Sequence, residues 1–540
     1  MTNTYWHATA VQRVWLIDEL VRNILGHLPS VGSAKTLASC ARVSSTLSEP
    51  ALDLLWSRMT GLSPLCQLLP QCCDDSDAER TDGAATSLPD KQLEVIAEED
   101  WTRFARYARR VRKLHYQCTE GPSERVRQRT FAALVRGAAR LGSPLLPRLE
   151  ELSWLQFSQD VAQYLHFLSP SLRRVTVYVQ VGHRTGPTLP PPTPPGPPLQ
   201  SDRGARHAGG LLRVLDEMSP DVEELSLEGM ELPTPTSLEP LSAFKRLRSL
   251  HLGSVAAPVS VILSYCAAMP NLSSLSVDLT RCNTNLHLAS HKVRPQDEPT
   301  LHALEVLRVV GTPSCIEELL CAVDSPRLRS VSISLSIPEH DRTGGTRGLG
   351  LLGSRFSASL QTVRVHYKRT SARAAAAHAR PFAQYAQPLL PLRNTRECSL
   401  TIEDVAPIRM TDADVQTMAE AWPALTTLEI LLRSSAGAGA PTALPSITAL
   451  GAFARVCPHL TSLRIPMSQD VSALEAVETT RSSAPDGRAH GLRTLWLSAA
   501  WFTREESRRV MRHLEQTFPD VDLVPMLSAG VLRRGGVYAV

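Results

Sequence analysis

A three-position apolar pattern recurs thirteen times along this chain of 540 residues, each time with the spacing X, X+3 and X+5. The last two positions are two residues apart, so their side chains point to the same face of a β-strand. The first position lies three residues earlier, in the bend that leads into the strand. One such unit cannot bury its apolar side alone, so the pattern predicts copies that stack into a long surface. The copies are Val111/Leu114/Tyr116, Leu149/Leu152/Trp154, Leu172/Val175/Val177, Val222/Leu225/Leu227, Leu247/Leu250/Leu252, Leu272/Leu275/Val277, Leu304/Leu307/Val309, Leu328/Val331/Ile333, Leu360/Val363/Val365, Thr395/Cys398/Leu400, Leu425/Leu428/Ile430, Leu460/Leu463/Ile465 and Leu492/Leu495/Leu497.

Amphipathic helices are expected ahead of many of these strands, because apolar residues recur there at i, i+3, i+4 and i+7. A proline follows each stripe within a few residues and ends the helix. The stripes are Val161/Tyr164/Leu165/Leu168, Leu211/Val214/Leu215/Met218, Ile262/Tyr265/Cys266/Met269, Ile316/Leu319/Leu320/Val323, Val415/Met418/Ala419/Trp422 and Leu450/Phe453/Ala454/Cys457. The order is therefore helix, proline, short strand and loop, repeated at intervals of 23 to 50 residues.

This order resembles leucine-rich repeats, in which parallel strands line the concave side and helices cover the convex side. We therefore expect an α/β fold with a leucine-rich-repeat-like solenoid over residues 101–525. Regular repeats carry Asn or Cys a few positions past the strand, but Phe157, Met230 and Val255 stand in three of those places. The repeats are therefore expected to be irregular. The alternative is an ordinary α/β domain with leucine-rich strands.

Composition limits the functional class. The formal net charge of +4 argues against a strong field for nucleic acid or for an anionic membrane. Eleven cysteines are scattered, mostly within apolar stripes, which is typical of reduced core residues. No secretory signal is visible at the N-terminus, and no apolar run approaches the roughly 18 residues of a membrane span. We expect an intracellular protein of the cytoplasm and/or nucleus, with no cofactor and no membrane partner.

Residues 14–60 have the pattern of a separate helical module. Apolar residues at four-residue steps from Leu16 to Leu28 predict a first helix, which Pro29 ends. A second helix is expected over roughly residues 34–46. Ser48 is the expected N-cap of a third helix, with Pro50 in its first turn. Repeating apolar positions from Leu52 to Met59 continue this third helix.

This module resembles the F-box, a motif of about this length near the N-terminus of many substrate receptors. The matching segments are Leu16-Ile17-Asp18-Glu19-Leu20, Ile24-Leu25, Leu28, Leu37-Ala38-Ser39-Cys40-Ala41-Arg42-Val43-Ser44 and Ser48-Glu49-Pro50-Ala51-Leu52-Asp53-Leu54-Leu55-Trp56. The second half, with the later Asp100-Trp101, Phe104 and Tyr107-Ala108, is similar to F-box proteins of mushroom-forming fungi. Family members usually have Leu-Pro at the start of the first helix, and here Ile17 occupies the proline position.

The resemblance implies that residues 14–60 bind the Skp-type adaptor of a Skp–cullin–F-box ubiquitin ligase. The chain would then be a non-catalytic receptor that holds a protein substrate, of unknown identity, near the conjugating enzyme. Part of the apolar set must instead form the internal core of the module, and the sequence leaves the two roles unseparated. The adaptor-contact candidates are Leu16, Ile17, Leu20, Ile24, Leu25, Leu28, Val43, Leu55 and Trp56.

Loops and linkers complete the organisation. Residues 61–100 are expected to be an acidic linker, and residues 526–540 a C-terminal tail. A proline-rich loop is expected over 183–209 within one repeat, with polyproline II character. Similar loops are expected at 284–300, 338–358, 369–393 and 434–446.

Several short motifs in the chain resemble parts of catalytic or ligand sites. Residues 348–353 satisfy G-x-G-x-x-G, but they do not follow a strand directly, so a glycine-rich loop is the better interpretation. His287 and His291 lack the glutamate and third ligand of a metal site. Neither Cys72-Cys73 nor Cys315 with Cys321 has zinc spacing. No motif of a hydrolase or nucleotide enzyme was found, so we expect a protein without catalytic activity.

An arginine-rich segment spans residues 101–140. The aromatic residues Trp101, Phe104 and Tyr107 have helical core spacing, so we expect the arginines to form the solvated side of a helix rather than a nucleic-acid site.

Two functional hypotheses remain from the sequence: a ubiquitin-ligase receptor, and a ligase-independent repeat scaffold or regulatory protein-interaction module. In either case the substrate or partner would lie on the concave strands or the loop tips. The candidate positions there are Ser226, Ser249, His251, Ser276, Arg308, Ser332 and Arg364.

Overall fold

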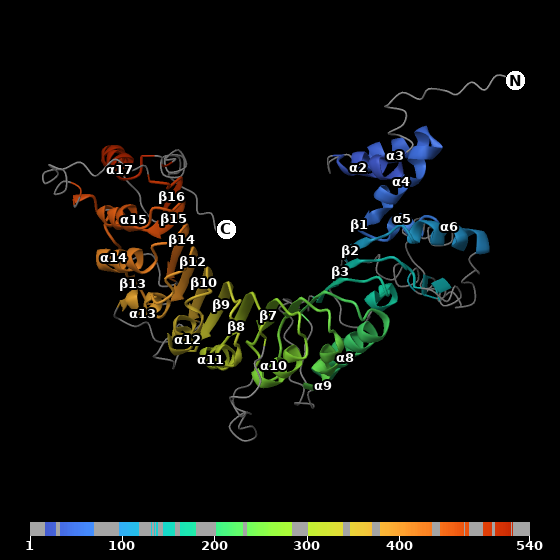
Figure 1. The fold of residues 1–540 in the computed structure, drawn as a ribbon, viewed down its shortest axis with the longest axis horizontal. Helices are drawn as coiled ribbons and strands as arrows, with labels where there is room; N and C mark the ends of the chain where they lie inside the picture. The colour runs from blue at the N-terminus through green and yellow to red at the C-terminus, as the bar shows by residue number, and fades with distance from the viewer. Residues whose placement is uncertain are drawn as a thin grey trace, which may run out of the picture. The chain divides into compact units, whose positions relative to one another are not determined.

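The structure is a computed structural model, and it describes residues 17–28, 33–69, 97–117, 144–156, 163–179, 201–229, 235–282, 301–338, 346–369, 379–404, 406–434, 443–468, 490–498 and 503–519, with a few single positions besides. These residues fall into two compact units, Met1–Gly253 and Ser254–Val540. In both units short parallel strands alternate with helices along the chain (Figure 1). The chain is thus an α/β protein with a leucine-rich-repeat-like solenoid fold.

Unit 1 begins with three helices, α2 (Asp18–Gly26), α3 (Ser33–Val43) and α4 (Ser45–Ser57). After them come α5 (Ser63–Cys66), α6 (Glu98–Ala108), η3 (Gln163–Phe167), α8 (Ser201–Met218), α9 (Pro235–Leu238) and η4 (Glu239–Ala243). Its strands pair in chain order, all parallel. They are β1 (Arg58–Met59), β2 (Lys113–Gln117), β3 (Glu151–Gln156), β4 (Arg174–Val179), β5 (Glu224–Glu228) and β6 (Ser249–Leu252).

Unit 2 has the same organisation, with eight strands in one parallel ladder. They are β7 (Ser274–Asp278), β8 (Val306–Gly311), β9 (Ser330–Ile337), β10 (Thr362–Arg369), β12 (Glu397–Asp404), β14 (Thr427–Ser434), β15 (Ser462–Pro466) and β16 (Thr494–Ser498). The helices lie along one side of this ladder (Figure 1). They are α10 (Val259–Ala267), α11 (Pro313–Ala322), α12 (Thr346–Phe356), α13 (Ala383–Ala386), η6 (Gln387–Leu389), α14 (Asp412–Ala421), η7 (Ile447–Leu450), α15 (Gly451–Val456) and α17 (Arg504–Thr517). A small side pair joins β11 (Arg380–Pro381) to β13 (Ile408–Arg409).

All thirteen strands expected from the apolar pattern are confirmed, and each begins two residues after the first position of its pattern. The pattern residues are buried, apart from Leu497, whose side chain lies outside the described residues. Neighbouring patterns pair in register, as Leu307 with Val331 and Val331 with Val363 show. The core therefore runs as a continuous apolar layer between the strands and the helices of each unit.

Buried serines before the prolines join one repeat to the previous one. The hydroxyl of Ser219 donates to the carbonyl oxygen of Ser169 at 2.7 Å, and that of Ser325 donates to the carbonyl oxygen of Leu304 at 2.7 Å. Ser169 itself donates to the carbonyl oxygen of Leu149 at 3.1 Å. In regular repeats an asparagine side chain satisfies such backbone groups. Here the serine that precedes each proline donates the hydrogen bond to these carbonyl oxygens.

Several expectations on local structure were wrong. The expected acidic linker 61–100 contains the short helix α5 and the first residues of α6. Residues 348–353 lie inside α12 rather than in a loop: Gly348 and Gly353 allow this helix to approach Glu317 and Pro391, within 3.2 and 2.9 Å of an added Cβ. Helix α8 begins at Ser201, so it includes the last nine residues of the expected loop 183–209. The apolar stripe in the second half of the helix anchors it. The stripe at 161–168 forms only the short 3-10 helix η3. In the segment 369–393, β11, α13 and η6 replace much of the expected loop.

Candidate functional site

The three N-terminal helices form a small helical head with its own core. Val21, Leu25, Leu37 and Ala51 are buried there. Leu28, Cys40, Ala41, Leu47, Leu54 and Leu55 pack against them. The third helix begins earlier than expected: Ser44, not Ser48, is the N-cap of α4, and its hydroxyl accepts a hydrogen bond from the Leu47 amide at 3.2 Å. A core cluster of four buried residues gives the head little stability of its own.

A second group of apolar residues on the head faces solvent. Ile17, Leu20 and Ile24 are 44, 40 and 44 % exposed, and their spacing of three and four residues places them on one face of α2. Val43, the last residue of α3, is 74 % exposed. Only three other large apolar side chains of the described residues are exposed, namely Tyr178, Met218 and Trp496, at 36, 39 and 47 %. The gathering of the four on two short helices makes them candidates for an interaction surface.

The structure thus separates the two roles that the sequence left mixed. Leu25, Leu28 and Leu55 belong to the core of the head. Trp56 contacts Tyr107 of α6, with ring centroids 4.8 Å apart and the ring planes tilted by 42°, so it packs against the first repeat. Leu16 lies outside the described residues. Of the nine candidates, Ile17, Leu20, Ile24 and Val43 remain available to a partner.

The head is joined to the repeats by an ion-pair cluster. Arg110, whose side chain is 5 % exposed, donates to the carboxylates of Glu49 and Asp53 on α4. Arg106 of α6 contacts Glu49 at 3.0 Å, and Arg22 of α2 contacts Asp53 at 2.7 Å. The hydrogen bonds from Arg110 and Arg106 lower the pKa of Glu49 below its ordinary value. Burial opposes the charge of Arg110, but the bond to Glu49 and the charges of Asp53 and Glu49 outweigh it and raise its pKa.

This cluster was missed in the sequence, where the arginines of 101–140 were expected on the solvated side. Trp101 and Phe104 are buried as expected, and Arg103 and Arg109 are exposed, but Arg110 is not. A signal existed in the sequence, because Glu49 and Asp53 are four residues apart and so are Arg106 and Arg110. Two short segments therefore carry complementary charges at equal spacing. The backbone strengthens the junction, because β1 follows α4 directly and pairs with β2.

The remaining motif residues form no site in the described part of the chain. His287, His291, Cys72 and Cys73 lie outside it. Cys315 is buried on α11 and Cys321 is exposed. No group of three or more potential metal ligands occurs among the residues with described positions. Within the same residues no helix has the length and apolar character needed to cross a membrane.

The strand positions expected to face a substrate alternate with the buried ones. Ser226, Ser249, His251, Ser276 and Ser332 are half-buried, and Arg308 and Arg364 are exposed. These side chains lie on the strand face opposite the helices, which we call the open face.

Comparisons with known proteins reveal similarity of fold alone. No protein-family model and no curated protein matches the chain. Among solved structures, Rad7 in its complex with Elc1 from yeast is 13 % identical, with a TM-score of 0.34, covering 80 % of this chain and 92 % of that one. A leucine-rich-repeat protein of Leptospira interrogans, LIC12759, is 13 % identical with a TM-score of 0.27, covering 70 and 91 %. TLR13 in complex with ssRNA13 is 13 % identical with a TM-score of 0.30, covering 74 and 56 %.

Proposed function

We propose that this chain is the substrate-recognition subunit of a Skp–cullin–F-box type ubiquitin ligase. The head binds the Skp-type adaptor through Ile17, Leu20, Ile24 and Val43, and the adaptor connects the chain to the cullin. The repeat region holds a protein substrate. The observation that carries this proposal is an apolar face on α2 that stays in solvent although the head has a separate core beside it.

The energetics of the head favour a partner at this face. Complete burial of a Leu, Ile or Val side chain contributes about 1.5–3 kcal/mol. Ile17, Leu20, Ile24 and Val43 leave much of that free energy unused, since each is at least 40 % exposed. An adaptor that covers them supplies the burial that three short helices lack, and a polar replacement there removes binding without emptying the core.

The function proposed is proximity rather than chemistry. The receptor raises the effective concentration of substrate lysines near a ubiquitin-loaded enzyme, and this requires a head that is fixed on the repeats. The Arg110 cluster, the Trp56–Tyr107 contact and the β1–β2 pairing all serve that purpose in unit 1. No catalytic residue of its own is assigned to the chain, and we place it in the cytoplasm and/or nucleus.

Co-purification with a Skp-type adaptor tests the proposal. The wild-type chain should bind, and the double variant Leu20→Asp/Ile24→Asp should lose binding by about a hundredfold or more, since it puts two charges into an apolar contact. Met218→Asp/Tyr178→Asp is the matched control, because it changes two apolar residues of similar exposure outside the head. Circular dichroism verifies that all variants fold.

A wild-type chain that does not bind the adaptor would overturn the proposal, and so would a Leu20→Asp/Ile24→Asp variant that still binds. The first result would leave the second hypothesis, a ligase-independent repeat scaffold or regulatory protein-interaction module. Ile17 is relevant to the choice between the two hypotheses, because it is the N-cap of α2 and occupies the position where the F-box family usually has proline.

A further inference from the structure

Three consecutive strands of unit 2 carry a basic open face. Their open-face side chains include three permanent cations and one histidine, and no carboxylate. In β8 they are Val306, Arg308 and Val310; in β9, Ser330, Ser332, Ser334 and Ser336; in β10, Thr362, Arg364, His366 and Lys368. We call these eleven side chains the β8–β10 face.

The strand register gives the cations a defined arrangement. Arg308 and Arg364 are both aligned with Ser332, one from each side. Since neighbouring strands are about 4.8 Å apart, the two arginine Cα atoms are about 10 Å apart with a serine hydroxyl between them. Lys368 lies four residues beyond Arg364 on the same strand, which corresponds to about 13 Å. Four half-buried serines thus form a polar floor between positive charges.

The positive charge of this face is not neutralised within the described part of the chain. Arg308 and Lys368 are exposed, and neither side chain has a hydrogen bond or an ion pair there. Arg364 contacts Glu397 of β12 at 3.0 Å, but the two side chains are 52 and 48 % exposed. An ion pair so exposed is weak and can exchange partners.

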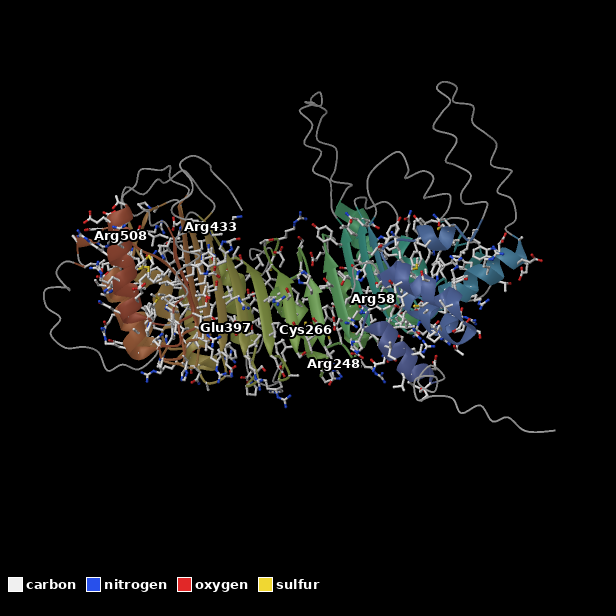
Figure 2. All side chains as sticks on the ribbon, turned by 90° about the horizontal axis from the view of Figure 1, so that it is seen from above. Arg58, Arg248, Cys266, Glu397, Arg433 and Arg508 are labelled. Carbon is white, nitrogen blue, oxygen red and sulfur yellow. The ribbon has the colours of Figure 1, made fainter. Side chains whose placement is uncertain are left out.

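The strands that follow differ, because their open faces carry carboxylates as well as arginines. Glu429 of β14 contacts Arg464 of β15 at 3.0 Å, and Glu403 of β12 contacts Arg433 of β14 at 3.2 Å. Figure 2 labels Glu397 and Arg433, which mark β12 and β14 in this part of unit 2. On the open faces of β8 to β15, the permanent cations without an ion pair are therefore Arg308 and Lys368.

We propose that the β8–β10 face binds an acidic segment of a partner protein in an extended conformation. An extended chain places side chains i and i+4 about 13 Å apart on one side, which is the spacing of Arg364 and Lys368. Carboxylates at these two positions pair with the two cations, and Arg308 lies beside them across the Ser332 row. This inference rests on the proposed function, because the partner it describes is the protein that the receptor holds.

Charge and side-chain type favour a protein rather than a nucleic acid. Single-stranded nucleic acid is bound by cations interleaved with aromatic side chains on which bases stack. None of the eleven side chains of the β8–β10 face is aromatic except the imidazole of His366, which contacts Ser334 at 3.4 Å and Glu403 at 3.4 Å. The net charge of the whole chain, +4, is also small for a nucleic-acid protein of this length.

Fluorescence anisotropy with labelled peptides tests the inference on the full chain. A peptide of alternating Glu and Ser should bind, and one of alternating Lys and Ser should not. Added salt should weaken the binding of the Glu peptide. Arg308→Glu/Lys368→Glu should weaken it by about tenfold or more, since two attractions become repulsions. The control Arg347→Glu/Arg508→Glu makes the same change of charge on α12 and α17 and should leave binding unchanged.

Two results would overturn the inference. One is that the Arg308→Glu/Lys368→Glu variant and the wild-type chain bind the Glu peptide equally well. The other is that the wild-type chain binds an oligothymidylate more tightly than the Glu peptide, and that the same two substitutions weaken this binding. Failure here is distinct from failure of the proposed function. The Leu20→Asp/Ile24→Asp variant should bind the Glu peptide normally, and the Arg308→Glu/Lys368→Glu variant should bind the adaptor normally.

Discussion

Replacement of Arg110 by Met should loosen the head from the first repeat. The side chain of Arg110 is 5 % exposed, whereas its partners Glu49 and Asp53 are 55 and 33 % exposed. Loss of one partner of a fully buried ion pair costs about 3–5 kcal/mol, and loss of an exposed pair costs up to about 1 kcal/mol. Here the arginine is buried but its acids can return to water, so we expect about 2 kcal/mol. Met keeps most of the apolar contacts of the arginine stem.

Hydrogen exchange in α4, followed by mass spectrometry, measures this change locally. A loss of about 2 kcal/mol corresponds to roughly a 30-fold faster exchange of the α4 amides. Arg109→Met is the matched control, because Arg109 is the neighbouring residue, is exposed, and has no ion pair within the described residues. Unchanged exchange in Arg110→Met would refute the reasoning, and so would an equal effect of Arg109→Met.

The same cluster should make the head sensitive to acid. The pKa of Glu49 is lowered in the folded chain from its ordinary value of 4.5, first by the hydrogen bond from Arg110 and then by that from Arg106. The resulting stabilisation is present above pH 4.5 and is lost as the pH falls through the lower, folded-state pKa. Exchange in α4, corrected for its intrinsic pH dependence, should therefore accelerate below pH 4.5 in the wild-type chain. The acceleration should be smaller in Arg110→Met.

Two further predictions concern unit 2. Gly353→Ala should destabilise unit 2 by about 1–3 kcal/mol, because an added Cβ lies 2.9 Å from the Cβ of Pro391. Gly350→Ala in the same helix should stabilise it by about 0.5–1 kcal/mol, because no atom lies within 4 Å of the added Cβ. Urea denaturation checks the pair, and equal shifts would contradict the packing described for α12. Asp404→Asn should destabilise by about 2–4 kcal/mol, because the carboxylate is 3 % exposed and faces Arg369 at 3.4 Å and Arg380 at 3.7 Å. Asp324 is 68 % exposed, so Asp324→Asn should lower the free energy of unfolding by less than about 1 kcal/mol. An equal loss of stability in the two variants would show that burial does not determine the effect.

The repeated strands could be predicted from the sequence because their signal is redundant. A single triplet such as Leu272/Leu275/Val277 is weak evidence, but thirteen in phase leave few other folds, and each strand stands where its triplet predicts. β1 was missed because it has two residues and follows α4 without a break. Residues 348–353 were misassigned because glycine is a poor helix former, and the close contact of α12 with Pro391 outweighs that preference.

The site was only partly predictable, for a geometric reason. Leu20 and Leu25 are equally apolar and both belong to the stripe of the first helix, yet one faces solvent and the other the core. The pattern of apolar residues along the first helix does not reveal which side of that helix packs against α4. Arg110 was assigned to the solvent because a charge is usually exposed, and only the position of Glu49 and Asp53 reverses that preference.

Hydroxyl-radical footprinting, with and without a Skp-type adaptor, tests the central claim most directly, because it measures side-chain exposure residue by residue. In the free chain Ile17, Leu20, Ile24 and Val43 should all react. With the adaptor bound, these four should lose reactivity several-fold, while the exposed residues Tyr178, Met218 and Trp496 outside the head should not change. Protection confined to the repeats, or no protection of the head at saturating adaptor, would contradict the claim that the apolar face of α2 is the adaptor-binding surface.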